Sequence, residues 1–142
     1  MKIIFQANKS VTFQKTPSQI ADYINDYGNL LSYVLIDPSG GEGLNFNIKT
    51  SVDIFNEIRN KNPDLAIGFA GGLSGKNVKK IILGLKSRLN HDNFSIDAES
   101  GLRDNHKCRM YEYHKYDNNS SDILNIGKVK DYLQSSSLVF DR

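Results

Sequence analysis

The 142-residue sequence is poor in cysteine, lacks tryptophan and has little net charge. Its one cysteine, Cys108, excludes a disulfide within the chain and favours a reducing compartment, so we expect a cytoplasmic protein. No apolar run approaches the ~20 residues of a membrane span, and the run at residues 3–5 is too short for a signal peptide. A net charge of +2, evenly scattered, argues against nucleic acid or a membrane surface as a partner.

What the sequence does contain is a regular alternation of short apolar runs and helical patterns. Runs rich in Ile, Val and Phe predict strands at residues 2–7, 32–37, 65–70 and 94–98. Stripes of apolar residues three and four apart predict helices at 16–28, 50–62, 77–90 and 126–136. Thr16, with Pro17 and Gln19, is typical of a helix start, and Thr50 with Asp53 forms a weaker capping pair.

This order predicts one α/β domain over residues 1–142 with a parallel sheet and right-handed crossovers. Two architectures fit four such units: a small open doubly wound sheet, or a (βα)4 half of a TIM barrel. The polar segment at about 102–125 is too long for a simple turn. It is an exposed insertion, a substrate lid or a partner surface.

Candidate functional residues follow the ends of the predicted strands, where α/β folds place their sites. Gly71 and Gly72 follow the third strand, and Ser100 and Gly101 follow the fourth. Backbone amides exposed by such loops bind phosphate, although a glycine pair is also typical of a plain tight turn.

The second strand ends in Asp37, which either has a functional role or forms a turn before Pro38. Three glycines follow it closely, more than a plain turn needs, and they suit a loop that wraps a ligand: Gly40, Gly41 and Gly43. Gln6 and Lys9, at the end of the first strand, could face the same ligand. We expect no cofactor and no metal, because the spacing of His106, Cys108 and His114 fits no common zinc pattern.

Three linked motifs resemble phosphoribosylanthranilate isomerase, a (βα)8-barrel family of tryptophan biosynthesis. The first motif is an aspartate followed by a Gly-Gly-x-Gly-x-x-Phe loop, the second a Gly-Gly-Leu loop with Asn-Val at the helix start, and the third Asp-x-x-Ser-Gly. The matching residues are Asp37, Gly40, Gly41, Gly43 and Phe46; Gly71, Gly72, Leu73, Asn77 and Val78; and Asp97, Ser100 and Gly101.

The resemblance implies that the chain corresponds to strands five to eight of the barrel. It implies Asp37 as the general acid of a sugar-phosphate isomerisation, and the Gly71–Leu73 and Ser100–Gly101 loops as the phosphate site. The family's general base, a cysteine on its first strand, has no counterpart here. Asn47 and Ile48 replace the family's Asp-Trp after the phenylalanine, and the last loop is longer.

Three hypotheses follow from this pattern. The chain is a phosphosugar-binding half barrel that needs a second half for isomerase activity, a non-catalytic phosphate-ligand binding or assembly module, or a fragment of a longer barrel. We expect the inner layer of a half barrel to be apolar, with Ile4, Leu35, Ile67 and Phe69 or their alternate neighbours. Such a layer predicts self-association or pairing with a separate N-terminal half, unless segment 102–125 covers it.

Overall fold

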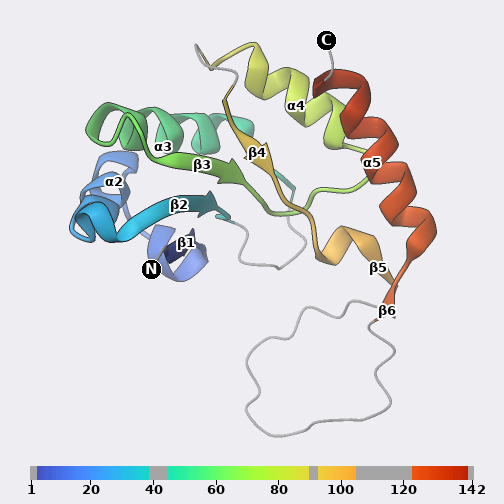
Figure 1. The fold of residues 1–142 in the computed structure, drawn as a ribbon, viewed down its shortest axis with the longest axis horizontal. Helices are drawn as coiled ribbons and strands as arrows, with labels where there is room; N and C mark the ends of the chain where they lie inside the picture. The colour runs from blue at the N-terminus through green and yellow to red at the C-terminus, as the bar shows by residue number, and fades with distance from the viewer. Residues whose placement is uncertain (1–2, 39–44, 90–92, 105–122, 141–142) are drawn as a thin grey trace, which may run out of the picture.

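A computed structural model describes residues 3–38, 45–89, 93–104 and 123–140 (Figure 1). Strands and helices alternate along the chain, as the sequence predicts. The strands are β1 (Ile3–Ala7), β2 (Leu31–Ile36), β3 (Ala66–Phe69), β4 (Ser95–Ile96), β5 (Arg103–Asp104) and β6 (Ile123–Leu124). The α-helices are α1 (Lys9–Thr12), α2 (Pro17–Asn25), α3 (Ile48–Lys61), α4 (Val78–Lys86) and α5 (Ile126–Phe140), with 3-10 turns at η1 (Gly28–Leu30) and η2 (Ser100–Leu102).

The main sheet has four parallel strands in the order β1-β2-β3-β4, which confirms the predicted parallel α/β fold. Strand order follows chain order without the reversal that defines a doubly wound sheet. Each new strand therefore joins the sheet next to the preceding strand, and always on the same side of it.

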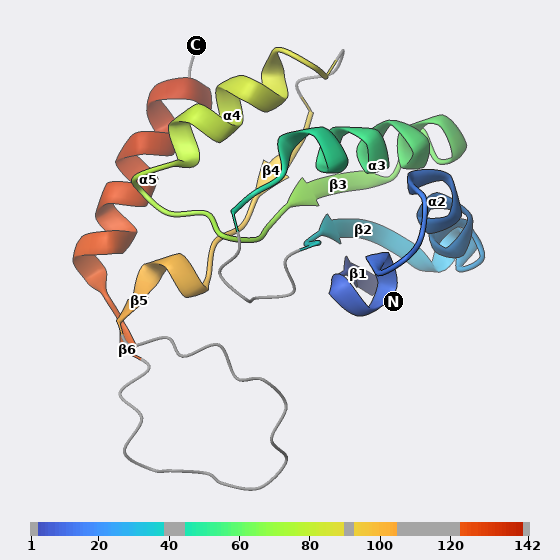
Figure 2. The same ribbon diagram turned by 180° about the vertical axis from the view of Figure 1, so that it is seen from behind.

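All four long helices cover one side of this sheet (Figures 1 and 2). Helix α2 packs on α3 and α4 packs on α5, with a smaller contact between α3 and α4. Sequential crossovers of the same hand produce this one-sided layer, because each repeats the same turn in the same direction. No helix in the described part of the chain is long and apolar enough to cross a membrane.

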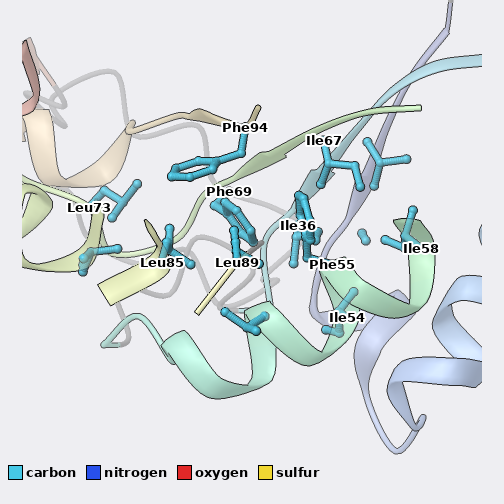
Figure 3. Close-up of a cluster of buried hydrophobic side chains, with 14 of the residues drawn as sticks. Ile36, Ile54, Phe55, Ile58, Ile67, Phe69, Leu73, Leu85, Leu89 and Phe94 are labelled. Atoms are coloured by element: carbon cyan, nitrogen blue, oxygen red, sulfur yellow. The ribbon is translucent and has the colours of Figure 1, made fainter. Parts of the chain in front are cut away.

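The core lies between the sheet and the helices (Figure 3). Phe69 on β3 is at its centre, with its ring 5.6 Å from the stacked ring of Phe55 on α3 and 5.5 Å from that of Phe94. Val34, Ile36 and Ile67 join it on the helix side and are almost fully buried. These side chains supply the burial that holds α3 against β2 and β3.

Within the described residues no helix covers the opposite face of the sheet, and the composition of this face differs from the prediction. Ile67 and Phe69, expected to point inward with Ile4 and Leu35, point to the helices instead. The pairing register explains this, because Gln6, Leu35, Gly68 and Ser95 share one level of the open face, whereas Ile36, Phe69 and Ile96 share the helix side. The open face is therefore mixed, and its Ile4 is 69% exposed.

Helix starts are set by local side-chain caps. Thr16 and Gln19 form the predicted reciprocal capping box of α2. The prediction of Thr50 as the cap of α3 is wrong. The helix begins at Ile48, because the Asn47 side chain accepts the Thr50 N–H at 3.1 Å.

The long polar segment leaves and returns through a short antiparallel pair. Arg103 pairs with Leu124 and Asp104 with Ile123, so β5 and β6 bring the two ends of the segment together. Residues 105–122 lie outside the described residues, and so do His106, Cys108 and His114.

Candidate functional site

Asp37 lies at the carboxyl end of β2, where its carboxylate is held by the neighbouring strand. Its side chain is only 5% exposed, and its backbone N–H donates to the Ala7 carbonyl at 3.1 Å. The Gln6 Nε2 donates to Asp37 Oδ2 at 3.0 Å. The structure thus brings together two of the residues predicted from sequence, and Gln6 fixes the orientation of a buried carboxylate.

Lys9 follows at the same edge of the sheet, as the first residue of the single turn α1. Asn8 caps this turn by accepting from the N–H and the hydroxyl of Ser10, at 3.0 and 2.6 Å. Lys9 itself is exposed. The short helix therefore places a cationic residue beside the end of β1, adjacent to the strand that carries Asp37.

The loop after β3 has the conformation that its glycines allow. Gly71 and Gly72 have φ values of 103° and 64°, in the left-handed region where other residues are strained. Asn77 clamps the loop, since its Nδ2 donates to the Gly72 carbonyl at 2.8 Å and its Oδ1 accepts the Ser74 N–H at 2.9 Å. The amides of Gly71, Gly72 and Leu73 have no acceptor within the described residues.

The side chain of Leu73 is buried and therefore does not face a ligand site. Its side chain is 1% exposed and belongs to the hydrophobic core. Only the backbone amide of Leu73 is placed to meet a ligand, while its side chain anchors the loop to the fold.

The loop after β4 touches the loop after β3. Gly101 sits so close to Leu73 that a Cβ on Gly101 would lie 2.1 Å from the Leu73 carbonyl oxygen. Ser100 and Gly101 are the first residues of η2, so their amides have no acceptor within that turn. Two loops 28 positions apart in sequence (Gly101 against Leu73) therefore form one surface at the carboxyl edge of the sheet.

Two hollows flank this loop contact. One, of about 240 Å³, lies between the loop after β2 and the loop after β3, and it is lined by Pro38, Asn45, Phe46, Asn47, Thr50, Ala70 and Gly71. Gly40, Gly41 and Gly43 of the first loop lie outside the described residues. The other hollow, of about 450 Å³, is lined by Ser74, Gly75, Lys76, Gly101, Lys128, Asp131, Gln134 and Ser135.

The larger hollow carries charge, but one of its lysines is already engaged. Lys128 Nζ donates to the Arg103 carbonyl at 2.6 Å and lies 2.9 Å from Asp104 Oδ1. Its hydrogen bond, followed by that from Asn125, lowers the pKa of the Asp104 carboxyl. The smaller hollow, which adjoins Gly71 and the end of β2, is the better candidate for a ligand site.

Three further polar residues near the sheet did not stand out in the sequence. Tyr33 and Ser95 hydroxyls meet at 2.6 Å on the open face. Tyr132 on α5 has a buried hydroxyl without a hydrogen-bond partner among the described residues, and burial, followed by the charge of Asp97, raises its pKa well above the ordinary value. Side chains alternate between the two faces of a strand, so Tyr33, four residues before Asp37, is expected on the same face as Asp37. This alternation was the one signal in the sequence that could have placed Tyr33 on the open face.

Comparisons with protein families, with curated proteins and with solved structures give no match for this chain.

Proposed function

We propose that this chain is the C-terminal half of a (βα)8 barrel similar to phosphoribosylanthranilate isomerase, and that it binds a phosphorylated sugar. The observation that carries the proposal is the contact between Gly101 and Leu73. It joins two glycine-containing loops from adjacent parallel strands, and amides in both loops lack internal acceptors among the described residues. Backbone amides of two such loops stabilise the oxygens of a phosphate group where they point to one spot.

Strand order and helix placement support the barrel part of the proposal. A closed barrel needs strands in chain order with every helix outside, and this sheet has four parallel strands in that order with one helix layer. A barrel also places its functional groups at the carboxyl ends of the strands. Asp37, Gly71 and Ser100 all follow strand ends on this edge.

In the proposed mechanism, Asp37 transfers a proton to the ring oxygen of an aminoaldose phosphate and the ring opens. The smaller hollow holds the sugar between Phe46 and Gly71, and the glycine loops hold the phosphate. Gln6 keeps the carboxyl group of Asp37 in position. The later Amadori shift requires a base, and the cysteine that serves as the base in the family has no counterpart among the matched residues.

That missing base favours a second candidate, a non-catalytic phosphate-ligand binding module. Both candidates predict phosphate binding, and only the first predicts isomerisation. Titration of ¹⁵N-labelled protein with inorganic phosphate and then with ribose 5-phosphate tests the binding site by amide shifts. We expect saturable shifts of Gly71, Gly72, Leu73, Ser100 and Gly101. Shifts confined to other amides would remove the site.

The enzymatic candidate needs its own assay. Conversion of phosphoribosylanthranilate to its aminoketose is measured by the loss of substrate fluorescence. Turnover that disappears in Asp37→Asn supports the isomerase, whereas saturable phosphate binding without turnover supports the binding module.

A further inference from the structure

The larger of the two hollows forms where three segments of the chain meet. Helix α5 lies against η2 and α4 (Figures 1 and 2), and the loop after β3 completes the wall. The volume of about 450 Å³ falls within the roughly 300–1,000 Å³ that is usual for small-molecule sites. In the proposed function the sugar occupies the smaller hollow, so the larger hollow has no assigned occupant.

Two glycines allow the walls of the larger hollow to approach one another. A Cβ at Gly75 would lie 2.8 Å from Asp131 Cβ and 3.0 Å from the Tyr132 nitrogen. A Cβ at Gly101 would lie 2.1 Å from the Leu73 carbonyl oxygen. Because neither position has room for a side chain, the shape of the hollow depends on glycine at both.

The lining of the larger hollow is polar. Its residues are serines, glycines, lysines, an aspartate and a glutamine, and none of them is apolar. An apolar ligand would gain little from burial here. The hollow therefore favours a ligand whose own polar groups bond with these walls.

Two charged side chains of the lining have no partner within the part of the chain that the structure describes. They are Lys76, on the loop after β3, and Asp131, on α5, and both are exposed. No ion pair joins them to each other. Lys128 differs, because its ammonium group lies 2.9 Å from Asp104 Oδ1 and donates to the Arg103 carbonyl. The hollow thus offers one available cation and one available carboxylate.

Two neutral polar side chains on α5 accompany these charges. The Gln134 amide and the Ser135 hydroxyl line the same hollow, and neither has a hydrogen-bond partner among the described residues. Asp131 precedes them by three and four positions, which places all three on one helix face. An amide and a hydroxyl both donate and accept hydrogen bonds, so they suit a polar side chain of a ligand.

We propose that the larger hollow binds a free α-amino acid with a polar side chain. The Lys76 ammonium group binds the α-carboxylate, the Asp131 carboxylate binds the α-ammonium group, and α5 supplies the hydrogen bonds to the side chain. A zwitterion fits better than a simple anion, which Asp131 repels, and better than a simple amine, which Lys76 repels. Amino-acid binding here does not depend on the proposed phosphate site, although Gly101 borders both.

Ligand analogues test this site without a change in the protein. Isothermal titration calorimetry of the full chain, in a buffer without phosphate, should show saturable binding of L-glutamine or L-serine. The methyl ester of the bound amino acid lacks the carboxylate, and its N-acetyl derivative lacks the ammonium group. Each analogue should bind about tenfold or more weakly, because one charge-assisted hydrogen bond is lost. L-Leucine should also bind more weakly, since it has no polar side chain.

Two variants should change the preference between ligands. Lys76→Met should remove the advantage of the free amino acid over its methyl ester, and Asp131→Asn its advantage over the N-acetyl derivative. Lys79→Met is the matched control, because Lys79 is also an exposed lysine but lines a different hollow. It should leave both affinity ratios within about twofold. Circular dichroism checks that each variant keeps its helix content.

The absence of saturable binding by either amino acid overturns the proposal, as does binding that both Lys76→Met and Asp131→Asn leave unchanged. Inorganic phosphate that binds in this hollow more tightly than the amino acids also overturns it, and shifts of the Gly75 and Ser135 amides would show this. Amino-acid binding without any binding of phosphate or ribose 5-phosphate would instead count against the proposed function alone.

Discussion

The hydroxyls of Tyr33 on β2 and Ser95 on β4 lie 2.6 Å apart. Because β3 lies between these two strands, the two side chains reach over β3 to meet. This contact crosses directly above Gly68, whose missing side chain makes the space for it. A Cβ at residue 68 would lie 1.9 Å from the Tyr33 hydroxyl oxygen and 2.5 Å from Ser95 Oγ. Gly68 is therefore required by its neighbours in space, although it stands in the middle of a strand, where glycine is unfavourable.

Gly68→Ala should lower the free energy of unfolding by about 1–3 kcal/mol, because the tyrosine ring must move. Urea denaturation measures the change. The loss should be smaller when Gly68→Ala is introduced into the Tyr33→Ala background, because the side chain that clashes is then absent. Equal losses in the two backgrounds would show that Tyr33 is not the cause.

Asp37→Asn should keep the fold and abolish any isomerase activity. The amide oxygen can still accept from Gln6 Nε2, and the backbone bond from Asp37 N–H to Ala7 is unchanged. We expect a loss of stability below about 1 kcal/mol, which chemical denaturation measures. Full activity in this variant would remove Asp37 from the mechanism.

Gly72→Ala should weaken phosphate binding, because a methyl group is added beside the loop amides, which have no acceptor within the described residues. Gly28→Ala is the matched control, since Gly28 also has a positive φ, 50° against 64°, and lies in η1 away from the site. Both variants should lose about 1–2 kcal/mol of stability from the left-handed backbone. Calorimetric titration with phosphate should separate them, with affinity reduced in Gly72→Ala only.

Tyr132→Phe should leave the protein as stable or more stable, by up to about 1 kcal/mol. The Tyr132 hydroxyl is buried without a hydrogen-bond partner among the described residues, so its removal relieves a desolvation cost. Tyr27→Phe provides the comparison, because that hydroxyl donates to Tyr23 at 3.1 Å and is exposed. Thermal unfolding checks both, and a clear loss in Tyr132→Phe would mean that its hydroxyl has a partner.

The pKa of Asp104 should depend on Lys128. The Lys128 ammonium, and then the Asn125 amide, hold the folded-state pKa of this carboxyl below its ordinary value of 3.8. Because the folded pKa is the lower one, the pair stabilises the fold above pH 3.8, and this contribution is lost as the pH falls through the folded-state pKa. Carboxyl ¹³C titration should show the pKa rising toward 3.8 in Lys128→Met and unchanged in the control Lys130→Met.

The sequence by itself determined the elements of this fold, because their signals are local. Alternating short apolar runs and helical stripes predicted every strand of the main sheet and every long helix, with ends displaced by a few residues. The Thr16–Gln19 capping box was also readable, since both partners lie within one helical turn. The start of α3 was misplaced, because Asn47 and Thr50 are both residue types that cap helices well, and the structure shows that Asn47 is the cap.

Only the tertiary structure decided which strands are neighbours and which face of each strand is buried. The sequence left a doubly wound sheet and a barrel segment open, since each crossover can add its strand on either side, and chain order throughout is a result of packing. β3 is nearly apolar on both faces, so its pattern could not show that Ile67 and Phe69 point to the helices. The Gln6–Asp37 bond and the Gly101–Leu73 contact likewise join residues that are distant in sequence, and they arise only because parallel strands bring their carboxyl ends to one edge.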